Sequence, residues 1–175
     1  FYNNLGTVCG YLLEYKEAKS CFEKSLAINT SLFIENHPSI ASNYLCLGEM
    51  YQELCDFTKS IYYTQRALNI RIAIYGHNDF RVADLYIMLG RSYIDLDKTD
   101  MALSYFSEGL KIYERKDDSV MVKSSISDIY NDIGFCFYKQ NNNEQAIVYY
   151  EKAIELQKEL MSQNTFNEGF YAILI

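Results

Sequence analysis

Residues 44–48 read Tyr-Leu-Cys-Leu-Gly, and the pattern Tyr-x-x-Leu-Gly within this stretch decides the fold because it recurs along the chain. Copies begin at Tyr2, Tyr86 and Tyr130, the last with Ile133 in place of the leucine. The glycines stand at positions 6, 48, 90 and 134, which are 42, 42 and 44 residues apart. A recurrence this regular predicts one structural unit repeated along the chain. Repeat arrays mostly present binding surfaces and rarely carry out chemistry.

Each unit contains the patterns of two amphipathic helices. In the first helix, the Tyr, Leu and Gly lie at i, i+3 and i+4, on one helical stripe. The second helix carries a small residue twelve positions after the glycine, a large residue four positions later and an aliphatic residue four further on. The small residues are Ala18, Ser60, Ala102 and Ala146, and the large ones are Phe22, Phe106 and Tyr150, with Thr64 as the exception. Polar stretches at 97–100 and 141–143 predict tight turns between the two helices.

The recurring glycine predicts a close crossing of helices. Glycine inside a helix costs about 1 kcal/mol relative to alanine. We therefore expect a neighbouring helix to pass too close for a side chain, with the small residue of the second helix at the same crossing. One unit cannot bury its own stripe, whereas stacked units can. The predicted fold class is all-α, a right-handed α-solenoid of antiparallel helix pairs.

The predicted helices and units follow from these patterns. The helices span about residues 1–13, 17–33, 39–53, 57–75, 80–95, 99–115, 120–140, 143–161 and 166–175. The units span about residues 1–35, 36–77, 78–118 and 119–164, and a fifth begins at 165–175. Because the chain starts within a unit and lacks an initial Met, we expect a single array that is a fragment of a longer chain.

Composition and motifs argue against several classes of function. The net charge of −7 argues against nucleic-acid binding. The five scattered cysteines predict a reducing, cytoplasmic location, and no apolar run is long enough to insert into a membrane. The two histidines, His37 and His77, fall in loops between units without a cluster of metal-ligand spacing. Without a nucleophile or phosphate-binding motif, we expect no catalytic residue, no metal, no cofactor and no enzyme activity.

The repeated pattern resembles the tetratricopeptide repeat (TPR), whose signature combines Leu-Gly, Tyr, Ala and Phe on a period of about 34 residues. The period here is longer, at 42 residues, and the boundary at residues 36–41 reads Asn-His-Pro-Ser-Ile-Ala. Both features resemble the repeats of kinesin light chain and nephrocystin-3-type proteins. That resemblance implies an adaptor that binds peptide segments in a concave groove lined by the first helix of each unit.

The residues opposite the Tyr-Leu-Gly stripe would then form the groove. Six of them are carboxylates and two are cations, so the resemblance implies an acidic groove with apolar patches. The implied groove residues are Asn3, Asn4, Thr7, Tyr11, Leu45, Cys46, Glu49, Glu53, Asp84, Ile87, Met88, Arg91, Asp95, Asp128, Asn131, Asp132, Phe135 and Lys139.

The main hypothesis is a scaffold or adaptor for protein–protein interaction. Its partner would be a protein or peptide segment with basic and apolar residues. An alternative is a regulatory or linking segment of a larger signalling protein or enzyme, whose groove holds part of its own chain. A third hypothesis is self-association through exposed end helices.

Overall fold

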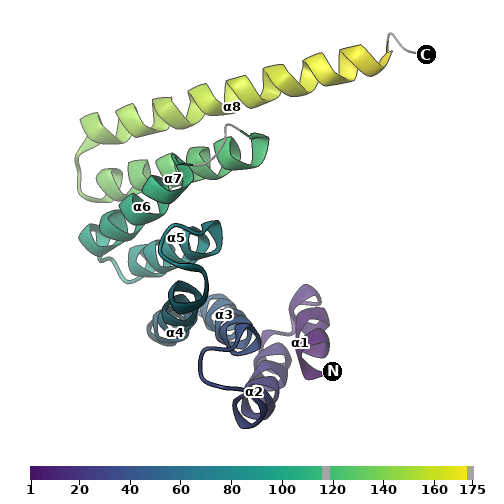
Figure 1. Cartoon of the computed structure of the whole chain (residues 1–175). Helices are drawn as coiled ribbons and strands as arrows, with labels where there is room; N and C mark the ends of the chain where they lie inside the picture. The colour runs from purple at the N-terminus through teal and green to yellow at the C-terminus, as the bar shows by residue number, and fades with distance from the viewer. Residues whose placement is uncertain (116–118, 173–175) are drawn as a thin grey trace.

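The computed structural model describes residues 1–115 and 119–172, with side chains up to Ser162. Every element of these described residues is a helix (Figure 1). The helices are α1 (Tyr2–Tyr11), α2 (Tyr15–Leu32), α3 (Pro38–Glu53), α4 (Phe57–Tyr75), α5 (Phe80–Asp95), α6 (Thr99–Tyr113), α7 (Val120–Lys139) and α8 (Asn143–Ala172). Units 1 to 4 are the pairs α1/α2, α3/α4, α5/α6 and α7/α8.

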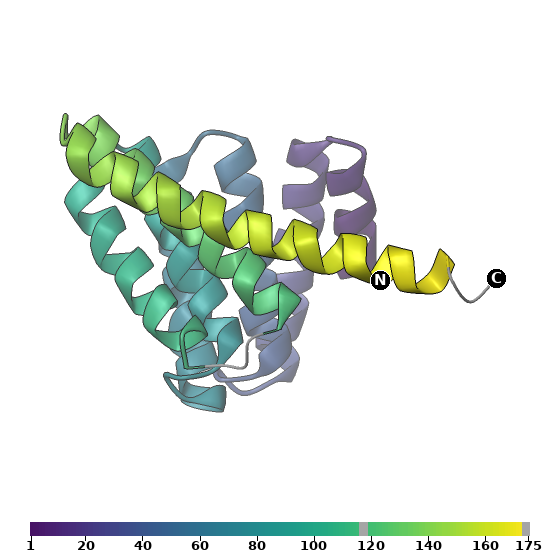
Figure 2. The ribbon, with the colours of Figure 1, turned by 90° about the horizontal axis from the view of Figure 1, so that it is seen from above.

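The helices stack in chain order. Each helix packs on the one before it and the one after it, and α5 also touches α7. Figure 1 shows a curved array that begins at α1 and ends at α8, and Figure 2 shows α8 running across the top of it. The predicted fold class, an all-α solenoid of helix pairs, is confirmed.

The C-terminal helix differs from the prediction. We predicted two helices, at 143–161 and 166–175, whereas α8 runs without a break over Asn143–Ala172. Residues 162–165 read Ser-Gln-Asn-Thr and contain neither Pro nor Gly, so nothing in this stretch forces the helix to end. Residues 173–175 lie outside the described residues, and the assignment of 165–175 to a fifth unit stays a prediction.

The turns within the four units are built in the same way. The residue seven positions after each repeated glycine has a left-handed backbone, with φ between 57° and 62° at Leu13, Cys55, Asp97 and Asn141. In unit 2, the N–H of Cys55 donates to the carbonyl of Gln52 and the N–H of Asp56 donates to that of Tyr51, both at 2.9 Å. These two bonds satisfy carbonyl groups at the end of α3. The repeated turn sets the direction in which each second helix returns.

Residues at the N-termini of several helices stabilise the first turn through local contacts. Asp56 accepts a hydrogen bond from the N–H of Lys59 at the start of α4, and Asp79 accepts one from the N–H of Arg81 at the start of α5. Pro38 occupies the first turn of α3, where its missing N–H removes no hydrogen bond. Side-chain capping of this kind marks the starts of α3, α4, α5 and α7.

The close helix crossing predicted from the glycines is present in all four units. A Cβ atom added to Gly90 would lie 2.6 Å from the ring of Phe106, and one added to Gly6 would lie 2.8 Å from Phe22. A Cβ added to Gly134 would lie 2.9 Å from the ring of Tyr150 in α8. In unit 2 a Cβ added to Gly48 would instead meet the hydroxyl oxygen of Thr64, at 2.5 Å. The small residues at the crossing are buried, as predicted.

The buried apolar side chains divide into three clusters. The largest runs through units 2 to 4, from Ala67 in α4 to Cys136 in α7. A second cluster joins unit 1 to α3 and includes Phe22 and Leu47. The third, smaller one lies where Ile40 of α3 meets the end of α4. The core therefore consists of one large cluster in the centre of the stack and two small ones towards its N-terminal end, joined through the partly buried side chains of Leu26 and Tyr44.

Candidate functional site

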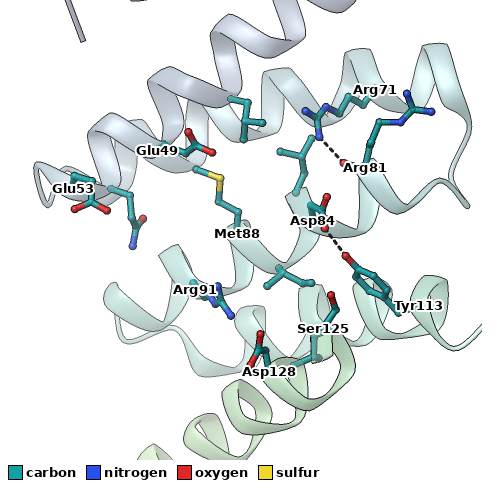
Figure 3. A pocket seen from close by; sticks show the side chains of 15 residues that line it. Glu49, Glu53, Arg71, Arg81, Asp84, Met88, Arg91, Tyr113, Ser125 and Asp128 are labelled. Carbon is teal, nitrogen blue, oxygen red and sulfur yellow. Dashed lines mark hydrogen bonds between the residues drawn. The ribbon is translucent and has the colours of Figure 1, made fainter. Parts of the chain in front are cut away.

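A pocket of about 590 Å³ lies across the middle of the stack, and we call it the central pocket (Figure 3). Its walls come mainly from α3, α5 and α7, the first helices of three successive units. Helices α4 and α6 add one side chain each, Arg71 and Tyr113. The repeat period brings Leu45, Ile87 and Met88 together as apolar lining between charged groups.

Two arginines of the central pocket are held by contacts near the boundary between α4 and α5. The guanidinium of Arg81 donates two hydrogen bonds to Asp79, at 2.8 and 2.9 Å, and lies 3.5 Å from the centre of the Tyr75 ring. Arg71 donates from Nη1 to the backbone carbonyl of Arg81 at 2.8 Å. Figure 3 shows the two side chains next to each other. Their positive charge is thus fixed at one end of the pocket.

The same side of the pocket also holds a carboxylate and a buried phenol, next to the two arginines. The hydroxyl of Tyr113 donates to Asp84 at 2.5 Å (Figure 3). Burial of the phenol, together with this carboxylate, raises the pKa of Tyr113 to about 12. Arg91 binds Asp132 of α7 at 2.8 Å, which connects units 3 and 4.

Glu49 of α3 is a pocket carboxylate whose pKa is raised by its surroundings. The side chain of Glu49 is exposed at the mouth of the pocket, but partial desolvation by the pocket walls raises its pKa, and the charge of Glu53 one turn away acts in the same direction. Arg71 opposes this shift, without cancelling it. The surroundings of Glu49 thus disfavour its ionised form. A cation placed next to Glu49 would favour that form.

A second pocket of about 410 Å³ adjoins the first, and we call it the N-terminal pocket. It lies between α1, α2 and α3, and it shares Glu49 and Glu53 with the central pocket. Thr7, Tyr11 and Cys46 are also part of its walls. Together the two pockets make one track along the first helices of the four units.

The track includes eleven of the eighteen residues implied for the groove. They are Thr7, Tyr11, Leu45, Cys46, Glu49, Glu53, Asp84, Ile87, Met88, Arg91 and Asp128. The remaining seven lie outside the two pockets: Asn3, Asn4, Asp95, Asn131, Asp132, Phe135 and Lys139.

Several of these seven side chains contact other parts of the stack. Asn3 accepts a hydrogen bond from the side chain of Asn43 at 3.2 Å. Asp95 accepts one from Gln52. Lys139 forms an ion pair with Asp97 at 2.8 Å. These contacts connect neighbouring units.

Sequence reasoning missed Arg71, Arg81 and Tyr113. The central pocket contains four carboxylates and three arginines, so it is less acidic than the groove implied by the resemblance. Arg71 and Tyr113 belong to second helices, and Arg81 lies in the first turn of α5, so none lies on the face that was considered. The signal that would have found Arg71 and Arg81 is their position on either side of the turn at 76–79.

The two histidines have local roles or lie exposed. His37 stacks on Phe33, with ring centres 3.8 Å apart, and its Nδ1 accepts a hydrogen bond from the N–H of Ser39. His77 is exposed in the turn before α5. Within residues 1–115 and 119–162, no group of three or more His, Cys, Asp or Glu side chains could hold a metal ion. None of the described helices combines the length and apolar character needed to cross a membrane.

Comparison with known protein families identifies the repeats. Three profiles described as tetratricopeptide repeat match residues 1–31, 39–115 and 127–160, which together cover most of the chain. No curated protein is significantly similar in sequence to the chain.

Several solved structures share the fold. The structure of BtubC (BKLC) from P. vanneervenii superposes with a TM-score of 0.86 at 19% identity, over 91% of this chain and 63% of that protein. MamA gives a TM-score of 0.68 at 19% identity, over 92% of this chain and 79% of that one. The kinesin light chain TPR-like repeats of Podosopora anserina give 0.64 at 11% identity, over 90% and 94%. This chain thus spans less than two thirds of the BtubC structure.

The matches support a general role. Tetratricopeptide repeats typically form scaffolds for protein–protein interaction, and this general role is the one that the matches support here. The repeated glycine crossing, the helix pairs and the three profile matches agree along the chain. The chain therefore belongs to the tetratricopeptide repeat family.

Proposed function

We propose that the chain binds a short segment of a partner protein along the track formed by the central and N-terminal pockets. The main support is the lining of the central pocket, which combines apolar side chains with charged groups from three successive units. Grooves of this kind recognise extended or helical segments through side chains that enter successive pockets. The repeat period places equivalent wall positions along the track, so one segment can contact several units.

The charges in the central pocket favour a basic partner segment. Arg81 and Arg91 each bind a carboxylate already. Among the described residues, Glu49 and Asp128 have no hydrogen-bond partner of their own. A lysine or arginine of the partner would pair with these carboxylates, while a large apolar neighbour would cover Met88. We therefore propose a segment in which basic residues stand beside large apolar ones.

The raised pKa of Glu49 gives this proposal a pH dependence. A bound cation favours the ionised carboxylate, so binding releases the proton wherever Glu49 is still protonated in the free protein. As the pH falls through the raised pKa, this release becomes an added cost of binding. Affinity for a basic peptide should therefore fall on acidification, starting at a higher pH than an ordinary glutamate would give.

Titration calorimetry with short peptides tests the proposal. A peptide that alternates Lys or Arg with Leu or Phe should bind, and binding should weaken with salt because charges contribute to it. In Glu49→Gln and Asp128→Asn variants we expect affinity to fall about tenfold, the size of one charge-assisted hydrogen bond. Glu151→Gln is the matched control, since Glu151 is an exposed carboxylate on α8. Equal binding by all variants, or a preference for acidic peptides, would contradict the proposal.

A further inference from the structure

Units 2, 3 and 4 each hold a pair of stacked aromatic rings between their two helices. One ring belongs to the residue three positions after the repeated glycine, and the other to the residue three positions after the small residue of the second helix. The ring centres lie 5.3 Å apart in units 2 and 3 and 5.5 Å apart in unit 4. The fold therefore brings these two register positions side by side in three successive units. The pairs are Tyr51 with Tyr63, Tyr93 with Tyr105, and Phe137 with Tyr149.

In unit 1, cysteines occupy both of these positions. Cys9 follows Gly6 by three residues on α1, and Cys21 follows Ala18 by three residues on α2. The close helix crossing lies next to them, because a Cβ atom added to Gly6 would come within 2.8 Å of Phe22. Register and crossing together place the two cysteine side chains next to each other between α1 and α2.

The two thiols also interact directly. Partial burial raises the pKa of the Cys9 thiol, and Cys21 acts in the same direction, through its charge and through a hydrogen bond between the two side chains. Among the described residues, no second thiol contributes to the raised pKa of Cys46 or of Cys136. Cys9 and Cys21 are therefore the cysteines that are placed to react with each other.

Cys9 is the member of the pair that a small molecule reaches first. Its side chain is half-buried, whereas Cys21 is buried. The equivalent residues Tyr93 and Phe137 are half-buried as well, although a complete unit precedes each of them. The partial exposure of Cys9 thus belongs to its register position and not to its place in the first helix.

We propose that Cys9 and Cys21 form a reversible disulfide that joins α1 to α2 in place of the aromatic pair. The oxidant is a small-molecule disulfide such as oxidised glutathione. The thiolate of Cys9 attacks one sulfur of that disulfide, which gives a mixed disulfide and releases one glutathione thiolate. The thiolate of Cys21 then attacks the Cys9 sulfur, and the second glutathione leaves. The two protons that the cysteines lose are taken up by the two glutathiones.

The bridge holds together the walls of the N-terminal pocket. Thr7 and Gly10 stand on either side of Cys9 along α1, and both line that pocket. Phe22, which follows Cys21 on α2, lines it as well. The bridge closes residues 9–21 into a loop, which lowers the entropy of any state in which α1 has separated from α2. Unit 1 is then held closed when glutathione is oxidised and is free to open when glutathione is reduced.

Peptide mapping of the whole chain after incubation with oxidised glutathione tests the bridge. The incubation is done at mildly alkaline pH because the thiolate is the reacting form, and remaining thiols are blocked before digestion. Trypsin should then give residues 1–16 linked to residues 20–24, and reduction should separate them. The Cys21→Ser variant should trap Cys9 as a mixed disulfide with glutathione. Cys46→Ser is the matched control, because Cys46 also packs against the cluster of Phe22, and it should form the bridge like the wild type.

Hydrogen exchange measures the consequence for unit 1. In the wild type, the amides of α1 should exchange more slowly after oxidation, by up to about a hundredfold, since the bridge removes loop entropy from the separated state. The Cys9→Ser variant cannot form the bridge, so its α1 amides should exchange at one rate with and without the oxidant.

Two results would overturn the proposal. The first is a wild type in which the exposed Cys55 is modified while Cys9 and Cys21 stay reduced, carry separate glutathiones or pair with other cysteines. The second is a bridged protein whose α1 amides exchange as fast as those of the reduced protein.

Discussion

Units 2 and 3 share one register, and they differ at the helix crossing. In unit 3, Gly90 faces the completely buried ring of Phe106. In unit 2, Gly48 faces the smaller Thr64, and the methyl group of Met88 from the next unit comes within 3.2 Å of where a Cβ of Gly48 would lie. The comparison shows that the close approach fixes the glycine, whereas the volume opposite it can be filled by a neighbouring unit.

The threonine that replaces the aromatic residue in unit 2, Thr64, brings a buried hydroxyl group without a hydrogen-bond partner among the described residues. The turns of the same two units differ as well, because the left-handed residue is Cys55 in unit 2 and Asp97 in unit 3. Asp adopts this conformation more readily than most residues. Unit 3 therefore fits the repeat better than unit 2 at both places.

Truncating the ring of unit 3 should give the largest effect. Phe106→Ala removes a fully buried aromatic side chain and leaves a cavity, so we expect a loss of about 3–5 kcal/mol in the free energy of unfolding. Urea unfolding measures it. Thr64→Ala at the equivalent position of unit 2 is the control and should cost far less, because it removes few atoms and relieves an unpaired hydroxyl. Similar losses in both variants would remove the distinction between the two units.

Adding a methyl group at the crossing should give the next largest effect. In Gly90→Ala the Cβ would meet the Phe106 ring, and we expect overpacking to destabilise the protein by about 1–3 kcal/mol. Gly10→Ala is the matched control, because its Cβ would come no closer than 3.7 Å to the flexible end of Met50. That variant should be stabilised by up to about 1 kcal/mol through helix propensity. Thermal unfolding of both variants should show shifts of opposite sign.

Removing the unpaired hydroxyl should sharpen the comparison with a smaller effect of opposite sign. Thr64→Val keeps the shape of the side chain and replaces the buried hydroxyl with a methyl group. We expect stabilisation by about 1 kcal/mol, the lower end of the cost of burying such a group unpaired. The same change at the exposed Thr58 should have little effect. A destabilised Thr64→Val protein would mean that the hydroxyl has a partner in solution.

The smallest effect should come from the turns. Cys55→Asn places a residue that tolerates left-handed backbone at a position with φ of 57°. We expect the free energy of unfolding to rise by about 0.5 kcal/mol, a fraction of the cost of this conformation for ordinary residues. Asn141→Cys makes the reverse change in unit 4 and should lower stability by a similar amount. Differential scanning calorimetry would compare the two melting temperatures.

The sequence predicts the repeat architecture well, because a glycine recurs at each place where the two helices of a unit pass close to each other. The crossing at Gly90 needed no knowledge of tertiary structure, since a costly residue recurred at one stripe position. The continuous α8 was missed because the repeat pattern predicted a boundary between units after residue 161. Residues 162–165 contain no helix breaker, and the helix continues through them. Arg71 was missed for a different reason: whether the end of a second helix reaches the pocket depends on how units rotate against one another. The spacing of residues within one unit does not specify that rotation.

The separate core clusters have a thermodynamic consequence. Cooperative unfolding requires that parts of a protein share buried contacts, and here the N-terminal cluster and the central cluster contain different side chains. The stack therefore has the means to open in stages, with α1 and α2 separating while α5 to α7 stay folded. A single free energy of unfolding then describes a region and not the whole chain. Variants in unit 3 report on the central region, whereas variants at Phe22 in unit 1 report on its junction with α3.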